Sequence, residues 1–274
     1  IGLKVTEMIP KAHAGELKSL YIIGENPMVS DPDLNHAEAS FKHLDFLVVQ
    51  DIFLTETAQI ADVVLPSACF AEKDGTFSNT ERRVQRVRKA VDPPGDSWDD
   101  WKITCEIARR MDYEMDYPDS EAIYARIDSE GLHWPCPTDD HPGTPILHIG
   151  QFPKGKGTFH AIGYIPPAEV ADDDYPLYLT TGRVLYQYHT GSMTRKTDGL
   201  NDRAPGTFVE ISPSDADQYG IEDGGEVSIS SRRGTIAVQV RISPMAVNGT
   251  VFLPFHFAEA AANKLTNAAL DPVS

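Results

Sequence analysis

Short apolar runs alternate with helix-like spacing over the first 66 residues of the chain. Runs of four or five aliphatic and β-branched residues predict buried strands, and apolar residues at three- and four-residue intervals predict helices. The strand runs are residues 19–23, 46–49 and 63–66, and the helical segments are residues 33–43 and 55–61. Buried strands separated by helices are typical of a parallel sheet covered on both faces. We therefore expect a Rossmann-like α/β portion here.

The middle of the chain carries one clear amphipathic helix. Residues 99–111 place Trp101, Cys105 and Met111 at helical spacing, and we expect Trp101 and Met111 to pack in a core. Proline, glycine and acidic residues are frequent from residue 113 to 176, which predicts a long connection with short strands. We place the domain boundary near residue 170, with an α/β portion over residues 1–170 and a second domain over 171–274.

The last hundred residues have the pattern of a small β-barrel. Ser212 and Pro213 are suited to open a short helix, and Gly220 is suited to close it in the left-handed conformation. Short strands joined by tight turns are typical of barrels. The predicted strands are residues 177–181, 207–211, 226–230, 235–240 and 249–254.

Composition narrows the range of partners. The net charge of −17 opposes binding to phosphate backbones and anionic lipid, so we expect neither a nucleic-acid nor a membrane partner. The three cysteines, Cys69, Cys105 and Cys136, form no CxxC pair. We therefore expect reduced, buried thiols and no metal ligand in this chain.

The segment Thr181–Arg195 carries the clearest signal of ligand binding. It follows a predicted strand and combines two glycines, two arginines, several hydroxyl groups and three aromatic rings. Gly182 and Gly191 permit close approach of the backbone, and Arg183 can fork onto a phosphate. The aromatic rings can contact a heterocycle. An ordinary surface loop is the alternative, and it explains this density of donors and rings less well.

Five segments together resemble the molybdopterin oxidoreductase family. The sequence His189–Thr194 is similar to the molybdopterin guanine dinucleotide-binding segment of formate dehydrogenases and nitrate reductases. The other segments, in chain order, are residues 24–27 (GENP), residues 48–66, residues 72–83 (EKDGTFSNTERR) and residues 256–267 (HFAEAAANKLTN). The last of these is most similar to formate dehydrogenases.

The resemblance implies a site built from both halves of the chain. Side chains at the sheet ends would meet the guanosine, Lys73 would offset phosphate charge, and the 181–190 segment would surround the pterin and pyrophosphate. Asp51 is also explained as a turn residue, Asp100 could replace Asp99, and His256 could be an internally hydrogen-bonded barrel histidine. The implied cofactor-binding residues are Asn26, Gln50, Asp51, Lys73, Asp99, Thr181, Gly182, Arg183, Tyr188, His189, Thr190, Ser192, Phe255 and Asn263.

The resemblance also implies a parent enzyme. This would be a formate dehydrogenase catalytic subunit with a bis-molybdopterin guanine dinucleotide (bis-MGD) group holding molybdenum or tungsten, and with a double-psi β-barrel at its C-terminus. The family's Fe–S cysteines and its cysteine or selenocysteine metal ligand have no counterpart here. We therefore expect a fragment, cut at both ends and inactive alone, that works with the rest of the subunit and an electron-transfer subunit. A cytoplasmic location is expected, with the periplasm open.

Two alternatives remain at this stage. A nitrate reductase catalytic subunit belongs to the same family and would share most of these segments. A non-catalytic double-psi barrel that binds a protein partner belongs to a different functional class. The donor-rich segment Thr181–Arg195 disfavours the second alternative.

Overall fold

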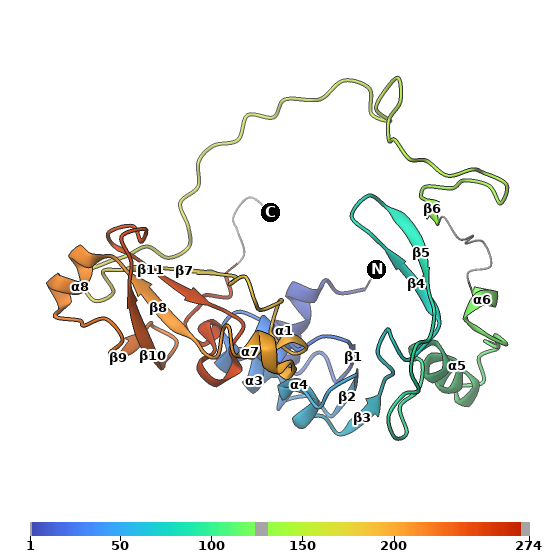
Figure 1. Ribbon diagram of the computed structural model, residues 1–274, viewed down its shortest axis with the longest axis horizontal. Helices are drawn as coiled ribbons and strands as arrows, with labels where there is room; N and C mark the ends of the chain where they lie inside the picture. Colours follow the sequence, from blue (N-terminus) through green and yellow to red (C-terminus); the bar gives the residue numbers. More distant parts are fainter. Residues whose placement is uncertain (1, 124–130, 270–274) are drawn as a thin grey trace. The chain divides into compact units, whose positions relative to one another are not determined.

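The three apolar runs near the N-terminus form a sheet with the strand order β1-β2-β3 (Figure 1). The computed structural model describes residues 2–123 and 131–269 of the chain. Strands β1 (Ser19–Ile23) and β2 (Phe46–Asp51) pair in parallel, and β3 (Val63–Pro66) lies on the other side of β2. The prediction of a parallel α/β sheet is confirmed.

Helices flank the strands of this sheet in the sequence. They are α1 (Val5–His13), α2 (Pro27–Ser30), α3 (Leu34–Phe41) and α4 (Glu56–Gln59). Both predicted helices are present, and each begins at a side-chain cap: Asp33 accepts from the backbone N–H of His36, and Thr55 accepts from that of Ala58. Helices α1 and α2 were not predicted, because α1 contains Pro10 and α2 is a single turn.

All five predicted strands of the C-terminal part are present in one mixed sheet. They are β7 (Tyr178–Gly182), β8 (Phe208–Ile211), β9 (Glu226–Ser230), β10 (Thr235–Ile242) and β11 (Thr250–Pro254). The order is β7-β11-β8-β10-β9, in which β7 pairs with β11 and β8 with β10 in parallel. Their inward residues form a buried aliphatic cluster that includes Val209, Val238 and Leu253.

Short helical turns connect these strands or follow the last of them. Helix α8 (Pro213–Tyr219) begins at Ser212, whose hydroxyl accepts from the N–H of Asp215, and ends at Gly220 with φ +67°, as predicted. The remaining turns are α7 (Asp198–Asn201) and the 3-10 helices η1 (Thr194–Lys196), η2 (Ala258–Ala260) and η3 (Ala262–Lys264).

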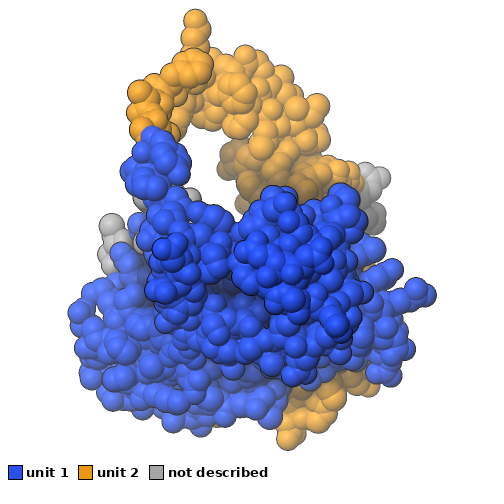
Figure 2. Space-filling model, turned by 90° about the vertical axis from the view of Figure 1, so that its left-hand side faces the viewer, with its two compact units in different colours: residues 1–64, 164–274 blue, residues 65–163 orange. Residues whose placement is uncertain are grey.

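The described chain forms two compact units (Figure 2). Unit 1 consists of residues 1–64 and 164–274, and unit 2 of residues 65–163. Unit 1 therefore contains strands β1 and β2 and the whole C-terminal sheet. Every contact discussed below for the candidate site lies inside one unit.

Unit 2 contains a hairpin and one longer helix. Strands β4 (Gly75–Ser78), β5 (Arg83–Val87) and β6 (Leu132–His133) form an antiparallel sheet, and the helices are α5 (Asp100–Arg110) and α6 (Ser120–Ile123). Helix α5 matches the predicted helix, but Met111 is 74% exposed, so its predicted core packing is wrong. Met111 lies at the C-cap beyond the last turn, and Ile103 is the buried residue of this helix.

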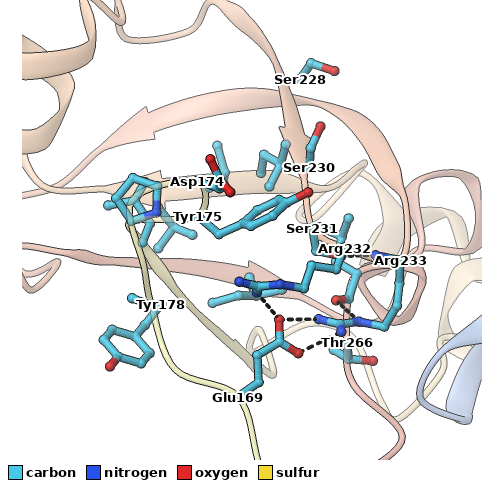
Figure 3. A pocket seen from close by; sticks show the side chains of 18 of the residues that line it. Glu169, Asp174, Tyr175, Tyr178, Ser228, Ser230, Ser231, Arg232, Arg233 and Thr266 are labelled. Carbon is cyan, nitrogen blue, oxygen red and sulfur yellow. Dashed lines mark hydrogen bonds and ion pairs between the residues drawn. The ribbon is translucent and has the colours of Figure 1, made fainter.

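Ion pairs and hydrogen bonds of Glu169 hold the end of the long connection, before β7, against the C-terminal sheet (Figure 3). The Glu169 carboxylate accepts from Arg233 at 2.7 and 3.1 Å, from Arg232 at 2.5 Å and from Asn267 at 3.0 Å. This part of the connection and the sheet line a largely apolar cavity of about 520 Å³, with Leu179 and Ile229 among its walls. Glu169 therefore joins the end of the long connection to the turn between β9 and β10.

We expect the interaction of Glu169 with Arg232 and Arg233 to weaken only in acid. Hydrogen bonds from Arg233, opposed in part by burial, lower the pKa of Glu169 from 4.5 to about 2. A carboxyl whose pKa is lower in the folded chain stabilises it fully above about pH 4.5, and this contribution is lost as the pH falls toward 2. The free-energy difference between wild type and Glu169→Gln, at most about 1 kcal/mol at pH 7 for a solvent-screened group, should shrink across this range. Urea unfolding between pH 7 and 3 measures it, with Glu222→Gln as the exposed control. A constant difference would contradict the assignment.

Candidate functional site

The segment Thr181–Arg195 leaves the sheet at the end of β7. Thr181 and Gly182 pair with Leu253 and Pro254 of β11, and the Gly182 carbonyl accepts from the N–H of Phe255 at 3.2 Å. A Cβ on Gly182 would lie 2.7 Å from the ring of Phe252. Glycine at position 182 therefore permits the close approach of β7 to the aromatic ring on β11.

A buried histidine supports the next part of this segment. His256 is 1% exposed, and its Nε2 accepts from the backbone N–H of Val184 at 2.9 Å, while its Nδ1 hydrogen-bonds the carbonyl of His189. Burial lowers the pKa of His256 below 6.5, and the hydrogen bond to the His189 carbonyl opposes this shift in part. The imidazole is therefore neutral at pH 7 and carries its proton on Nδ1.

Backbone conformation at two positions turns the segment back on itself. His189 has φ +45° and Gly191 has φ +73°. A Cβ on Gly191 would lie 2.6 Å from the carbonyl oxygen of His256. The close packing of residues 189–191 against residue 256 therefore requires glycine at position 191.

Two polar side chains close the base of the segment. The Arg195 guanidinium donates to the Pro205 carbonyl and to Glu259, each at 2.7 Å, and lies 4.8 Å from the centroid of the Phe257 ring. The amide oxygen of buried Gln187 accepts from the hydroxyl of Thr194 at 2.7 Å. The shape of the segment is thus fixed by the protein itself.

The outward side of the segment presents cations and aromatic rings. Arg183, with its guanidinium 5.4 Å from the Phe255 ring, and Lys196, 6.0 Å from the Phe53 ring, have no carboxylate partner within the described part of the chain. Tyr188 is 65% exposed and meets His189 edge to face. Unpaired cations beside aromatic rings in a chain of net charge −17 are the donor set that an anionic heterocyclic ligand requires. The residues present therefore fit a pterin nucleotide.

Asn26 links the N-terminal sheet to this segment. Its amide oxygen accepts from the N–H of Thr57 at 3.2 Å and from the hydroxyl of Thr57 at 2.8 Å. Its amide nitrogen donates to Glu56 at 2.8 Å and to the hydroxyl of Ser192 at 3.4 Å, and Ser192 in turn contacts Thr190 at 3.0 Å. The structure thus brings together the predicted site residues Asn26, Thr190 and Ser192.

A polar cavity of about 230 Å³ lies where these segments meet. It is lined by residues 53–56 and 59 from the N-terminal part and by residues 190–192, 195, 196, 256, 258 and 259 from the C-terminal part. Hydroxyl groups, two cations and two carboxylates therefore face one space. Its volume suits one end of a nucleotide rather than a whole dinucleotide.

Gln50 and Asp51 lie at the carboxyl end of β2, next to residues 53–56 of this cavity. Gln50 is fully buried and accepts from the hydroxyl of Tyr21. Asp51 accepts from the backbone N–H of Ile52 at 2.7 Å and of Phe53 at 3.3 Å, which is the geometry of a turn residue. These two contacts are those that the turn alternative for Asp51 predicts.

Asn263 joins the C-terminal part to α2. Its amide nitrogen donates to the carbonyls of Val29 at 2.9 Å and Ser30 at 3.1 Å, and its amide oxygen accepts from Thr266 at 3.1 Å. These contacts hold η3 against the helix that follows Asn26. Asn263 thus fixes a wall of the site through protein partners.

Lys73 and Asp99 belong to unit 2 and line a separate cavity of about 360 Å³. Lys73 pairs with Asp100, and Asp99 pairs with Lys102 at 3.2 Å. Asp99 occupies the N-cap of α5 without a side-chain cap bond. The two predicted residues are therefore near each other in unit 2, each with a protein partner.

Other chemistry is sparse in the described residues. The three cysteines are free, and they are partly buried where buried thiols were predicted. No cluster of three metal-ligating side chains occurs among the residues that the structure describes. Within the same residues, no helix has both the length and the apolar character needed to cross a bilayer.

Comparison with known proteins identifies the family. Residues 1–110 match the family model "Molybdopterin oxidoreductase", and residues 177–274 match "Molydopterin dinucleotide binding domain". The chain belongs to the molybdopterin oxidoreductase family. Its last hundred residues are accordingly a molybdopterin dinucleotide-binding domain, and the segment Thr181–Arg195 lies inside it.

Curated members of the molybdopterin oxidoreductase family include close relatives. The chain is 50% identical to F420-dependent formate dehydrogenase 1 subunit alpha of Methanococcus maripaludis, over 99% of this chain and 43% of the relative. It is 49% identical to F420-dependent formate dehydrogenase subunit alpha of Methanocaldococcus jannaschii, over 98% and 43%. Identity to the assimilatory nitrate reductase catalytic subunit of Bacillus subtilis is 39%, over 99% and 42%. The chain thus spans about two fifths of the length of these relatives.

A solved structure shows the same fold. Acetylene hydratase from Pelobacter acetylenicus superposes with a TM-score of 0.73 at 18% identity, covering 96% of this chain and 42% of that chain. At this identity the likeness concerns the fold alone.

Two residues of the polar network, Glu56 and Thr57, were not predicted from the sequence, and two roles were open for His256. Glu56 and Thr57 hold Asn26, and Thr57 is fully buried. Their position directly after the cap residue Thr55 was the available signal, because a first helical turn after a parallel strand faces the ligand edge of the sheet. His256 makes its hydrogen bonds inside the protein, as one of its two interpretations predicted.

Proposed function

We propose that this chain is the cofactor-binding part of a formate dehydrogenase catalytic subunit, which oxidises formate to carbon dioxide and passes on two electrons. The observation that carries the proposal is the 50% identity to a formate dehydrogenase alpha subunit over 99% of the chain. Nitrate reduction is the second candidate, and the lower identity of 39% makes it the weaker one.

In this proposal the bound group is bis-MGD with molybdenum or tungsten, which supplies the redox chemistry. The chain binds and orients one dinucleotide. Arg183 neutralises phosphate charge, the hydroxyls of Thr190 and Ser192 donate hydrogen bonds, and Tyr188 and Phe255 present rings to the pterin. The remaining assigned contacts are those of Asn26, Gln50, Asp51, Lys73, Asp99, Thr181, Gly182, His189 and Asn263.

The proposal extends to architecture and partners. Two parallel pairs of non-consecutive strands support a C-terminal barrel of the double-psi kind. The family models, which end at residue 110 and resume at residue 177, support a domain boundary near residue 170. The name "subunit alpha" in the relatives supports partner subunits, among them one that transfers electrons. An Fe–S cluster would lie in the rest of the catalytic subunit.

Arg183→Ala in the full-length subunit tests the site. Loss of one charge-assisted contact to phosphate should lower pterin affinity roughly 10- to 100-fold. The measurement is the pterin released per subunit on denaturation, read by fluorescence, together with formate oxidation. Arg241→Ala is the matched control, because this arginine also stacks on an aromatic ring, that of Phe208 at 3.6 Å.

Two results would count against the proposal. Full pterin content in Arg183→Ala would show that Arg183 does not contribute to cofactor binding. Absence of pterin from the wild-type subunit would favour the non-catalytic binding module. Formate oxidation by the wild type, with no nitrate reduction, decides between the two enzymes of the family.

A further inference from the structure

We propose that His256 is a positioning residue for the segment Thr181–Arg195, which it holds in its ligand-binding shape through both nitrogens of one neutral imidazole. That the segment binds a pterin rests on the proposed function. The clamp itself rests on contacts within unit 1 and stands without that assignment.

The geometry assigns opposite roles to the two ring nitrogens. Nε2 accepts from the N–H of Val184 at 2.9 Å, and Nδ1 donates to the carbonyl of His189. These two backbone groups bracket the residues that carry the exposed rings of Tyr186 and Tyr188. One rigid ring therefore fixes the distance between the two ends of the exposed stretch.

Packing alone does not explain a histidine at this position. His256 is 1% exposed, and its neighbour Phe255 packs against the buried aliphatic cluster of the C-terminal sheet. An apolar side chain of similar size would fill the volume but leave the Val184 N–H and the His189 carbonyl without partners. Buried unpaired groups of this kind are costly, so the hydrogen bonds determine the residue type.

Protonation would break one of the two contacts. A doubly protonated ring directs an N–H at the N–H of Val184, while the bond to the His189 carbonyl survives. Burial and the charge of Arg183 hold the pKa of His256 below 6.5, against the opposing effect of the hydrogen bond to the His189 carbonyl. The other charged groups around the adjoining cavity are Glu56, Arg195, Lys196 and Glu259. The clamp is therefore complete above about pH 6.5 and is lost as the pH falls through the lowered pKa.

Two conservative variants test the contacts of the two ring nitrogens one at a time. In His256→Gln the side-chain amide reaches the position of Nε2 and keeps an acceptor for Val184, and it cannot be protonated in this range. In His256→Asn the amide reaches the position of Nδ1 and keeps a donor for His189, but Val184 loses its acceptor. His160→Gln, at an exposed histidine of unit 2, is the matched control.

The test is hydrogen–deuterium exchange of peptides from Val184 to Thr194 in the full-length subunit, from pH 5 to 8, corrected for intrinsic exchange. In the wild type and in His160→Gln, protection at Val184 should fall in acid. His256→Gln should keep it at every pH, and His256→Asn should exchange roughly tenfold faster at every pH. Pterin retention should follow the same order.

The outcomes distinguish the clamp from the proposed function. Unchanged protection at Val184 in His256→Asn overturns the positioning role whatever the pterin content. The expected exchange pattern in a subunit that contains no pterin supports the clamp and overturns the proposed function. If His256→Asn fails to fold, the wild-type series is extended in acid to the onset of unfolding: loss of protection at Val184 before that onset supports the clamp, and protection unchanged up to it overturns the clamp.

Discussion

Gly191→Ala is expected to strip most of the pterin from the full-length subunit and to lower formate oxidation roughly 100-fold, since shifts of about 1 Å in a positioning segment have effects of this size. The added Cβ would lie 2.6 Å from the carbonyl oxygen of His256 and 2.7 Å from Cγ of Arg195. The first of these neighbours is backbone and cannot rotate away. Residues 189–192 must therefore move, and the contact between Ser192 and Asn26 moves with them.

A variant at a second glycine distinguishes the effect of this clash from the effect of backbone strain alone. Gly224 has φ +75°, close to the +73° of Gly191, but a Cβ there would have no heavy atom within 4 Å. Gly224→Ala therefore carries the same penalty for a left-handed residue, about 1–2 kcal/mol, without the clash. Pterin content and activity, measured side by side, should fall only in Gly191→Ala. Equal losses of pterin and activity in both variants would show that the close approach of residue 191 to His256 does not matter for cofactor binding.

Local sequence patterns predicted most of the regular structure of unit 1. Continuous apolar runs became β1, β2 and β3, and the Ser212–Gly220 pair bounded α8 as its caps require. The β4-β5 hairpin was not predictable in this way. Its turn uses Arg82 at φ +68°, a conformation in which glycine or asparagine is the usual signal. The fold was therefore predictable where local preference and tertiary structure agree.

The candidate site was predictable as a set of segments but not as a set of contacts. Glycines, arginines and rings identified residues 181–195, because their density is unusual for a surface loop. Nothing local to Asn26 indicates Ser192, which lies 166 positions away, and nothing local to His256 indicates Val184, 72 positions away. Long-range pairs of this kind are fixed by chain topology, which a single sequence reveals only through resemblance to a family.

Asn26→Asp is expected to destabilise the chain by about 3 kcal/mol at pH 7, through the loss of buried hydrogen bonds and the contact of two carboxylates. The aspartate keeps an oxygen for the N–H and hydroxyl of Thr57. Its second oxygen, however, replaces the amide nitrogen that donates to Glu56 at 2.8 Å. Two carboxylates would then share a site in which Asn26 is 6% exposed. The deficit should shrink as the pH is lowered, because one of the pair then takes a proton.

The reciprocal change at Glu56 should restore most of the lost stability. In the double variant Asn26→Asp with Glu56→Gln, the amide and the carboxylate exchange places, so donor and acceptor again face each other across the same 2.8 Å contact. Urea unfolding should place the double variant within about 1 kcal/mol of the wild type, a coupling that sites without contact do not show. Asn248→Asp, at an exposed asparagine, controls for the added charge. Additive losses of stability in the double variant would mean that Asn26 and Glu56 do not interact as the structure describes. The hydrogen bond with Glu56 would then not explain how the Asn26 amide is held toward Ser192.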